Sequence, residues 1–540
     1  MIELRKIPLR TVPGIIEGFL NSVTLFPTRP ALCVGGKTFT YTSLWEIAGR
    51  IAATILEADH AHNPLVAILA HRSLTAYASV LGIHSAGKGY VPLNPKFPID
   101  RLAKMLRQSQ CNAVIVGEEG RKTLEALLPH MERNLTILLP DVADTPAIAS
   151  AFPQHRFISS RGLASGSQSS ETPIVAPDSV AYLLFTSGST GEPKGVPVSQ
   201  DNVKAYIRYI CNQYQVSEYD RFSQMFDMTF DLSVHDMFVC WERGACLYVV
   251  PDAYVMAPAK FIKEQRLTMW FSVPSVVGFM SKMGTLKPGE FPSLRVSLFC
   301  GEPLPASSAT AWRNAAPQSI IENLYGPTET TIAITRYRWD ASNSPSACIN
   351  ATVPIGWVFD GQDACVVDQE GNPVSAEEPG ELCLSGSQVT RGYWNNPGKT
   401  AQQFVRLSAF GKKLWYRTGD LVKQDQSGCL YYLGRMDHQV KIRGYRVELQ
   451  EIDFVLRIAS ECEQVVSIAW PVREGIADGI IAFIFGSSNR STDDILAYCR
   501  DMLPEYMVPR QIHYLDDVPL NVNGKIDRSQ LVKLIDNRGA

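Results

Sequence analysis

A loop of small residues, hydroxyls and one lysine has the clearest chemical potential in the chain. The segment LLFTSGSTGEPKGV (183–196) carries Gly188, Gly191, Gly195 and Lys194. Glycines let backbone N–H groups approach an anion, hydroxyls donate hydrogen bonds, and lysine adds positive charge. The pattern indicates a phosphate-binding loop, although an ordinary polar turn has the same composition. Because Gly195 follows Lys194, the pattern G-x-x-x-x-G-K-[ST] is not met and a P-loop kinase or ATPase is not indicated.

Alternating apolar patterns predict the elements that must position this loop. Residues 40–56 and 73–87 show Thr/Ser cap signals or apolar residues at helical spacing. The short apolar runs 64–71 and 112–117 are typical of buried strands, and a further strand at 180–188 leads into the loop. Strands separated by helices predict a layered α/β architecture with a largely parallel sheet.

The composition changes further along the chain. A Ser/Gly-rich tract at 158–173 cannot supply a core, so we expect a surface loop there. After about residue 350, short strand patterns with turn signals predict a β-rich subdomain. Its expected strands lie within 363–374, 380–386 and 428–434.

The C-terminal region of the chain has its own pattern. A charged stretch (435–448) precedes a helix–strand–strand–helix pattern, with strands expected at 464–471 and 479–486. This predicts a small α+β domain. We therefore expect a large domain over 1–434 and a small domain over 435–540.

The overall composition excludes several classes of protein. The 540 residues are 45% hydrophobic and 19% charged, a balance that can bury a sizeable core. Fifty-one Lys and Arg against 54 Asp and Glu give a net charge of −3, so no basic excess supports nucleic-acid binding. No stretch approaches the ~18 apolar residues of a membrane helix, and no signal-peptide pattern opens the chain. We expect a cytoplasmic protein with neither a nucleic-acid nor a membrane partner.

The cysteines and a histidine pair offer little sign of a metal site. Twelve cysteines are scattered singly from Cys33 to Cys499, without a C-x-x-C pair. This favours buried free thiols in a reducing compartment over disulfides or structural zinc. His60 and His62 form an H-x-H in a polar loop, where a surface position is the simpler interpretation.

Eight ordered motifs give the chain a strong resemblance to a known family. They are FTSGSTGEPKG (185–195), FDLSVHDMF (230–238), NLYGPTETT (323–331), GELCLSG (380–386), RGYWNNP (391–397), YRTGDL (416–421), GRMDHQVKIRGYRVE (434–448) and NVNGKIDR (521–528). In this order and spacing the chain resembles the adenylate-forming enzymes over about residues 15–530. That family includes adenylation domains of nonribosomal peptide synthetases, acyl-CoA synthetases and firefly luciferase.

The resemblance implies a two-step reaction with ATP and Mg²⁺. A carboxylate attacks the α-phosphorus of MgATP to give an acyl-adenylate and pyrophosphate, and a thiol then takes the acyl group. Both steps depend on charge stabilisation and positioning. The small domain would swing between the steps around a hinge at Asp437. It would bring in Lys525 for adenylation and residues 441–444 for thiol transfer.

The nucleotide site follows from the same resemblance. The phosphate loop would hold the β- and γ-phosphates through Thr186, Ser187, Gly188, Ser189, Thr190 and Lys194. Tyr325 would stack on adenine, and Asn323 would offer its amide to the exocyclic amine. Asp420 would accept the ribose hydroxyls, with Arg435 beside the nucleotide. Gly301, Glu302 and Gly326 would complete the nucleotide site.

Three residues are implied in catalysis. Thr328 would contact the α-phosphate, and Glu329 would bind Mg²⁺, a hard cation that prefers carboxylate oxygen. Lys525 would bridge the substrate carboxylate and the nucleotide, neutralising charge as the adenylate forms.

Asp231 points to an amino-acid substrate. Amino-acid-activating members of the family place an aspartate at this position to pair with the substrate ammonium, and a buried carboxylate needs such a partner. An N-cap role before the following helix is the alternative. The other implied substrate-binding residues are mostly apolar: Leu232, His235, Phe271, Ser297, Phe299, Leu324, Ile332 and Ala333, together with Lys525.

The positions from Leu232 to Ala333 in this set predict a small or medium apolar amino acid, because they include no acid or lysine to pair with a charged side chain. The Asp-Leu start resembles freestanding prolyl-AMP ligases, which favours proline. The run FDLSV also resembles D-alanine–carrier-protein ligases.

The expected acceptor is a separate carrier protein with a phosphopantetheine thiol, because no carrier-domain serine motif follows Lys525. An acyl-CoA or aryl-acid ligase is one alternative, and Asp231 argues against it. A non-catalytic module that binds AMP or an amino acid is the other. The combination of Glu329, Asp420 and Lys525 argues against that module.

Overall fold

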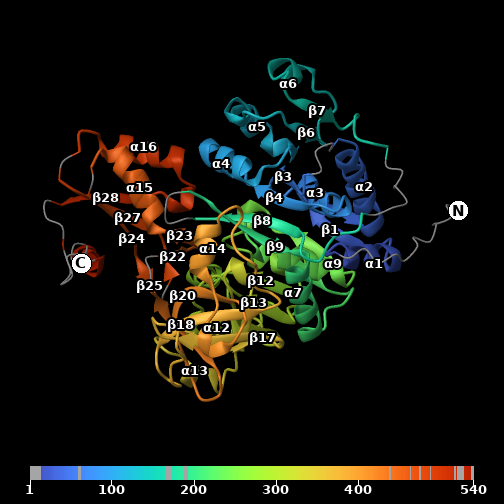
Figure 1. The fold of residues 1–540 in the computed structure, drawn as a ribbon. Helices are drawn as coiled ribbons and strands as arrows, with labels where there is room; N and C mark the ends of the chain where they lie inside the picture. Colours follow the sequence, from blue (N-terminus) through green and yellow to red (C-terminus); the bar gives the residue numbers. More distant parts are fainter. Residues whose placement is uncertain are drawn as a thin grey trace.

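The structure is a computed structural model that describes residues 14–58, 63–165, 173–187, 192–436, 439–462, 464–473, 476–486, 488–515, 519 and 528–536. The structure contains two large sheets, a smaller β-rich sheet and a C-terminal α+β region (Figure 1). The predicted α/β class is confirmed.

The first large sheet contains the strands predicted near the N-terminus. All neighbouring strands are parallel except the pair β8 and β9, which flanks the phosphate loop. Its order is β7 (Arg156–Ser159), β6 (Thr136–Leu139), β5 (Ala113–Val116), β3 (Leu65–Leu69), β4 (Gly89–Leu93), β8 (Val180–Thr186) and β9 (Lys194–Ser199). Every residue of β3 is buried, as expected for a continuous apolar run covered on both faces.

Helices surround this sheet and include the two predicted from spacing. They are α1 (Glu17–Leu25), α2 (Tyr41–Ala58), α3 (Leu74–Ser85), α4 (Ile99–Ser109), α5 (Arg121–Leu127), α6 (Pro146–Ala151) and α7 (Gln200–Gln213), with 3₁₀ turns η1 (Glu118–Gly120) and η2 (Leu128–His130). Ser73 caps α3 by accepting from the backbone of Ala76, and Ser199 with Asn202 forms a capping box on α7.

The second sheet carries most of the candidate site at the ends of its strands. Its order is β16 (Trp357–Val358), β15 (Thr335–Arg338), β14 (Ile320–Tyr325), β13 (Val296–Phe299), β12 (Met269–Ser272), β10 (Arg221–Gln224), β11 (Cys246–Val249), β1 (Pro30–Val34) and β2 (Lys37–Thr40). The strands from β14 to β1 run parallel, and antiparallel pairs close both edges. Ligands of such sheets bind beyond the carboxyl ends of the strands.

Short helices connect the strands of the second sheet. They are α8 (Leu232–Val234), the π-helical turn η3 (His235–Val239), α9 (Cys240–Glu242), η4 (Asp252–Tyr254), α10 (Ala259–Glu264), α11 (Pro274–Lys282), α12 (Ala306–Ala315), η5 (Thr328–Thr330) and α13 (Ser344–Ala347). The first three form one continuous helical segment that begins directly after Asp231.

The β-rich subdomain forms a five-stranded antiparallel sheet at the positions expected from the sequence. It contains β17 (Gln362–Val367), β18 (Gly380–Gly386), β20 (Trp415–Gln424) and β19 (Phe404–Val405), with β21 (Leu430–Arg435) paired to β20; α14 (Pro397–Gln403) and η6 (Ser408–Phe410) connect them.

The C-terminal region is more elaborate than the predicted helix–strand–strand–helix. One sheet orders β23 (Tyr445–Glu448), β22 (Gln439–Ile442), β26 (Ile476–Ala477) and β25 (Val472–Arg473), and the other β24 (Val465–Ala469), β27 (Ile480–Phe485) and β28 (Gln511–Leu515). The helices are α15 (Leu449–Ser460), α16 (Thr492–Met502), η7 (Glu505–Met507) and α17 (Arg528–Asp536). The hairpin β22–β23 lies in the charged stretch, which lacks the apolar alternation that signals a strand.

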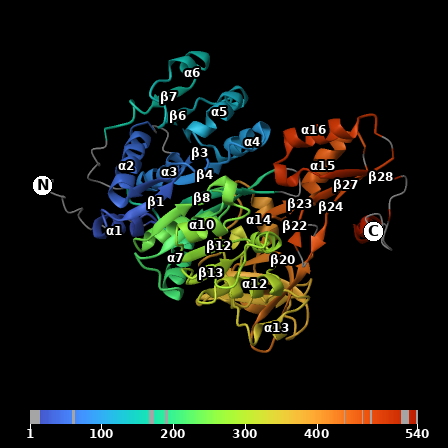
Figure 2. The ribbon, with the colours of Figure 1, turned by 180° about the vertical axis from the view of Figure 1, so that it is seen from behind.

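The C-terminal region lies against the first sheet on the side of α4, as Figures 1 and 2 show from opposite directions. Arg101 of α4 and Glu451 of α15 form a buried ion pair of 2.5 Å across this boundary. Either charge alone would be costly to bury, so this pair favours the arrangement in which Arg101 and Glu451 meet.

Candidate active site

The candidate site lies where the hairpin β22–β23 reaches the phosphate loop and the ends of β13 and β14. The backbone N–H of Gly444 donates to Glu302 Oε1 at 2.6 Å. The hydroxyl of Ser187 donates to the carbonyl of Arg446 at 2.7 Å. Residues 441–444 therefore lie at the predicted nucleotide site, which is the arrangement that the resemblance associates with thiol transfer.

Glu329 is the centre of a buried charge cluster. Its Oε1 lies 3.1 Å from Lys194 Nζ and accepts from the Tyr393 hydroxyl at 2.9 Å, while Oε2 lies 3.1 Å from Arg446 Nη1. Burial alone would raise the pKa of Glu329, but the two cations outweigh it and lower that pKa well below its usual range. Burial lowers the pKa of Lys194, although Glu329 works against this.

Asp420, which is predicted to bind the ribose, is hydrogen-bonded to Tyr325, which is predicted to stack on adenine. It accepts from the Tyr325 hydroxyl and, through Oδ1, from Arg435 Nη1 at 2.8 Å. The NH₂ group of Asn323 donates to the carbonyls of Val353 and Pro354 at 3.3 and 2.9 Å, so its Oδ1 is the atom suited to accept from an amine.

A small cavity of about 40 Å³ remains between these groups. It is lined by Gly301, Glu302, Pro303, Asn323, Leu324, Tyr325, Gly326, Thr352, Val353, Ile355, Asp420, Tyr432 and Lys441. Burial lowers the pKa of the Lys441 amine. Gly326 cannot be replaced without movement, because a Cβ there would lie 2.6 Å from the Cα of Ala333.

Asp231 is a buried carboxylate whose charge interacts with Lys441 of the cavity lining. It makes no side-chain cap to α8, so the N-cap alternative is not what the structure shows. Its Oδ2 has no hydrogen-bond partner among the described residues. Burial raises the pKa of Asp231 to about 6, against opposing effects of the Thr328 hydroxyl, the Ile332 backbone amide and Lys441.

The predicted substrate residues His235 and Phe271 pack against each other. The rings of His235 and Phe271 lie 4.6 Å apart, and Phe226 packs on Phe271 at 5.2 Å. The Tyr206 hydroxyl lies 2.8 Å from His235 Nδ1 and orients the imidazole. Burial lowers the pKa of His235 to about 3, so the ring is a neutral wall group. Leu232, Leu324, Ile332 and Ala333 are buried around the same region.

The prediction for Ser297 and Phe299 was wrong in register. Ser297 bonds the Ser319 hydroxyl at 2.8 Å, and the Phe299 ring packs on Trp312 of α12 at 5.4 Å. Phe271 pairs instead with Leu298, and residues paired across neighbouring strands share a face.

Leu298 and Cys300 therefore take the places predicted for Ser297 and Phe299. A shift by one residue along a strand exchanges its two faces. The residues Asp231 and Lys441 both influence the pKa of Cys300, in keeping with a position on their side of the sheet.

The turn that contains the predicted substrate residue Ile332 has a strained backbone. Thr331 and Ile332 have φ angles of 60° and 72°, in the left-handed region that β-branched residues rarely adopt. The buried amide of Gln388 donates to the carbonyl of Ala333 at 2.7 Å, and Thr331 Oγ1 donates to the carbonyl of Gln388 at 2.5 Å. Gln388 thus fixes this turn from the β-rich subdomain.

Several predicted residues lie outside the described residues: Gly188, Ser189, Thr190, Asp437, Lys525, His60 and His62. Thr186 is described, and its hydroxyl approaches the carbonyl of Lys194 at 3.5 Å. Sequence reasoning did not assign roles to Tyr393, Gln388 or Arg446. Tyr393 and Arg446 stand inside motifs of the resemblance, whereas Gln388 had no sequence signal.

Other predictions concern metals and membranes. All twelve cysteines are free thiols, nine of them buried, as expected. In the described regions of the chain no group of three or more His, Cys, Asp and Glu side chains is arranged to hold a metal ion. Within the same regions no helix has the length and apolar character needed to cross a membrane.

Comparison with known proteins places this geometry in a family. The family model of the AMP-binding enzyme matches residues 19–394. The D-alanine–D-alanyl carrier protein ligase of Lacticaseibacillus rhamnosus is 32% identical over 96% of this chain and 99% of that protein. The L-proline–[L-prolyl-carrier protein] ligase of Pseudomonas fluorescens is 29% identical, with the same two shares covered.

Solved structures agree with these matches. The crystal structure of the Vibrio cholerae adenylation domain AlmE in complex with glycyl-adenosine-5'-phosphate has a TM-score of 0.88 and 34% identity, covering 97% of this chain and 98% of that one. The sequence match and the fold cover nearly the whole chain. The chain therefore belongs to the AMP-binding enzyme family.

Proposed function

We propose that this enzyme activates a small uncharged amino acid with ATP and passes it to the phosphopantetheine thiol of a separate carrier protein. The observation that carries the proposal is the buried Asp231 carboxylate, whose Oδ2 lacks a partner among the described residues and whose charge interacts with Lys441 of the cavity lining. An α-ammonium would supply the missing charge partner. The substrate carboxylate would then face Thr328 and the nucleotide.

The substrate pocket supports a smaller amino acid than the sequence suggested. The exchange of Ser297 and Phe299 for Leu298 and Cys300 changes the summed side-chain volume little, so the size argument rests on the rings of His235 and Phe271, which meet at 4.6 Å. We therefore propose alanine or glycine ahead of proline. The relatives named for D-alanine and the structure with glycyl-adenylate are consistent with this order. Proline is the second candidate, because a relative of 29% identity is named for it.

The nucleotide would be ATP. Asn323 Oδ1 would accept from the adenine amine, Tyr325 would stack on the base, and Asp420 would exchange its present partners for the ribose hydroxyls. Ser187 and Lys194 would bind phosphate oxygens. The lysine would contribute point charge, which stabilises negative charge in a site shielded from water.

Glu329 fits a Mg²⁺ ligand. It is an ionised, hard oxygen donor next to the phosphate loop, and Mg²⁺ in such sites binds one or two carboxylates together with substrate phosphates. When bound, the ion would neutralise phosphate charge. Since Arg446 of the hairpin holds Oε2 at 3.1 Å, Glu329 would become available once the hairpin moves away.

The acceptor would enter with the domain arrangement seen here. Lys441 and Gly444 reach the nucleotide site, and Lys525 of the same C-terminal region would occupy it during the first step. We propose a mobile C-terminal domain over 435–540 with its hinge at Asp437. Carrier proteins named with the relatives support a carrier thiol over free CoA.

Pyrophosphate exchange tests the first step. Glycine, L-alanine, D-alanine and L-proline are compared at equal concentration, each against its deaminated acid. Exchange with glycine or alanine and none with the acids is expected. Exchange with the acids alone would instead identify an acyl- or aryl-acid ligase. No exchange with any substrate, in protein that binds ATP, would identify a non-catalytic module.

A second assay tests the acceptor. Equal concentrations of CoA and a phosphopantetheinylated carrier protein compete for the activated amino acid. We expect aminoacyl-carrier as the main product, and a predominance of aminoacyl-CoA would refute the carrier assignment.

A further inference from the structure

A short loop holds the candidate ammonium anchor between two regions of the molecule. Residues 225–231 connect β10 to α8 and end at Asp231. Asp227 lies four residues before the anchor, and its side chain is 11% exposed. Its Oδ1 accepts from the backbone N–H of Thr229 at 2.9 Å and from the Thr229 hydroxyl at 2.5 Å. These bonds fix the shape of the loop itself.

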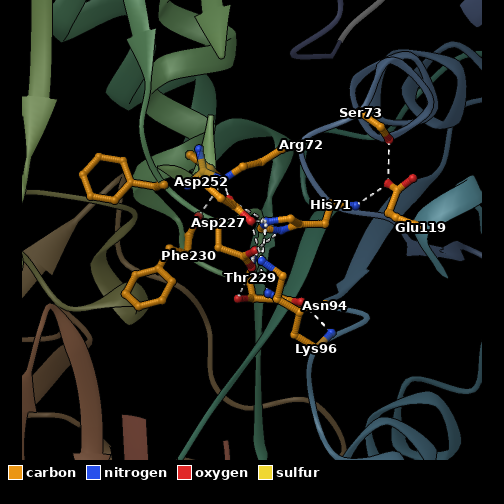
Figure 3. Close-up of polar contacts among 12 residues, drawn as sticks. His71, Arg72, Ser73, Asn94, Lys96, Glu119, Asp227, Thr229, Phe230 and Asp252 are labelled. Atoms are coloured by element: carbon orange, nitrogen blue, oxygen red, sulfur yellow. Dashed lines mark hydrogen bonds and ion pairs between the residues drawn. The ribbon is translucent and has the colours of Figure 1, made fainter. Parts of the chain in front are cut away.

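The other oxygen of Asp227 ties the loop to the first sheet. Oδ2 lies 2.9 Å from His71 Nδ1 and accepts from Asn94 Nδ2 at 2.8 Å (Figure 3). His71 lies two residues beyond the carboxyl end of β3, and Asn94 directly follows β4. Burial would raise the pKa of Asp227, but the hydrogen bond and charge of His71, together with Thr229, lower it.

The second ring nitrogen of His71 meets another carboxylate. Nε2 lies 3.1 Å from Asp252 Oδ1, and Asp252 also pairs with Arg72 at 3.0 Å and Lys96 at 2.5 Å. Carboxylate oxygens thus lie within hydrogen-bond distance of both ring nitrogens, which fixes the orientation of the imidazole. The ring is held on both sides and can in turn hold Asp227.

The same loop also touches the C-terminal region, through the residue that precedes the anchor. The rings of Phe230 and Tyr445, on β23, lie 4.4 Å apart and nearly perpendicular. If the C-terminal domain moves, this contact is lost, whereas the attachment of Asp227 to His71 lies within the large domain and is kept. The attachment to His71 would then position Asp231 throughout the cycle.

We propose that His71 is a positioning residue for substrate capture. Through Asp227 it holds the loop so that Asp231 meets the substrate ammonium. Among the described residues, the His71 ring bonds to Asp227, Asp252 and Lys96, and none of these three lines the nucleotide cavity. The inference rests on the proposed function, since it requires Asp231 to bind an ammonium.

Steady-state pyrophosphate exchange with His71→Ala tests the inference. The expected result is a KM for the amino acid raised about tenfold, as for loss of one charge-assisted hydrogen bond. The KM for ATP and kcat should stay within about twofold. His71→Gln, whose amide can donate to Asp227, should recover some of the loss. A general loosening of the fold would raise both KM values instead.

Two further variants keep the test decisive. Lys96→Ala removes an exposed contact to Asp252 and to the His71 ring without touching the loop, and it should leave both KM values unchanged. Asp227→Asn keeps the size of the side chain. It should raise the KM for the amino acid and leave the KM for ATP unchanged, as expected for His71→Ala, even if His71→Ala folds poorly.

The outcomes separate the two claims. An unchanged amino-acid KM in folded His71→Ala and Asp227→Asn, or parallel changes in both KM values, would overturn the inference alone. If the wild-type protein exchanges pyrophosphate with none of the amino acids tested, the proposed function is overturned, and this inference with it.

Discussion

Arg446 Nη1 lies 3.1 Å from Glu329 Oε2, and this ion pair joins the C-terminal hairpin to the residue expected to bind Mg²⁺. Glu329 is fully buried and Arg446 is partly buried, and the Arg446 backbone carbonyl also accepts from Ser187 of the phosphate loop. The strand β23 thus engages the groups that are predicted to contact Mg²⁺ and phosphate. Docking of this hairpin would therefore compete with Mg²⁺ binding at Glu329 and with phosphate binding at Ser187.

Arg446→Ala should slow thiol transfer and spare adenylate formation. Loss of one partner of a buried pair leaves the other charge poorly compensated, typically at about 3–5 kcal/mol, here reduced because Lys194 still pairs with Glu329. The check is carrier loading measured beside pyrophosphate exchange. Arg446→Lys serves as the charge-conserving control. A similar loss in both half-reactions would contradict the role.

Two lysines should separate the half-reactions in opposite directions. Lys525→Ala should lower pyrophosphate exchange by about 10²-fold or more while ATP binding is kept, because its contact forms mainly in the transition state. Lys441→Ala should keep exchange and lower transfer, since Lys441 lines the cavity in the present arrangement. Near-normal exchange by Lys525→Ala would reject its assignment.

Amino-acid capture should depend on pH through Asp231. Its pKa of about 6 means that the carboxylate is ionised above pH 6 and protonated below. Binding of the ammonium should therefore weaken as pH falls through about 6, seen as a rising KM for the amino acid. Asp231→Asn should bind weakly at every pH, and a wild-type KM that does not change between pH 5 and 7.5 would contradict this.

The same shift has the opposite sign for folding. The pKa of Asp231 is raised from 3.8 to about 6, so the protonated form favours the folded protein. Its contribution to the free energy of unfolding is complete below about pH 3.8 and is lost as pH rises through 6. Asp231→Asn should remove this component of the pH dependence, measured by denaturant unfolding without substrate.

Cys33 should be the most reactive thiol. Its Sγ lies 3.7 Å from Cys246 Sγ and 3.3 Å from Thr38 Oγ1. The hydrogen bond from Cys246 is the main reason that the pKa of Cys33 is lowered, whereas burial raises that of Cys348, which is equally half-buried. Iodoacetamide at neutral pH should label Cys33 first, as peptide mass spectrometry can follow. Cys246→Ala should slow the labelling, and equal rates at Cys33 and Cys348 would refute the prediction.

The sequence predicted the local elements well because their signals are local. The buried run of β3 and the Ser73 cap of α3 both show in a few neighbouring residues. The family motifs also led to Asp231 and Glu329. The face of β13 was missed because a pattern match carries no strand register, and one residue of error exchanges Ser297 for Leu298.

Contacts between distant segments had no sequence signal. His71 and Asp227 are 156 positions apart, and Glu329 and Arg446 are 117 apart. Their pairing depends on how two sheets and the C-terminal region pack together. The hairpin β22–β23 was likewise unpredicted, because charged residues that pair across an interface do not alternate with apolar ones.

The left-handed turn at Ile332 bears on how the substrate range of this enzyme could change. A β-branched residue at φ 72° holds conformational strain, generally about 1–3 kcal/mol, and Gln388 keeps it in place. Replacement by glycine would widen the pocket wall and release that strain together. Because Ile332 is buried, the released strain would offset part of the cost of losing its side chain. A lineage, or a protein engineer, could therefore reach bulkier amino acids at this position with a smaller loss of stability than most enlargements of a binding site cause.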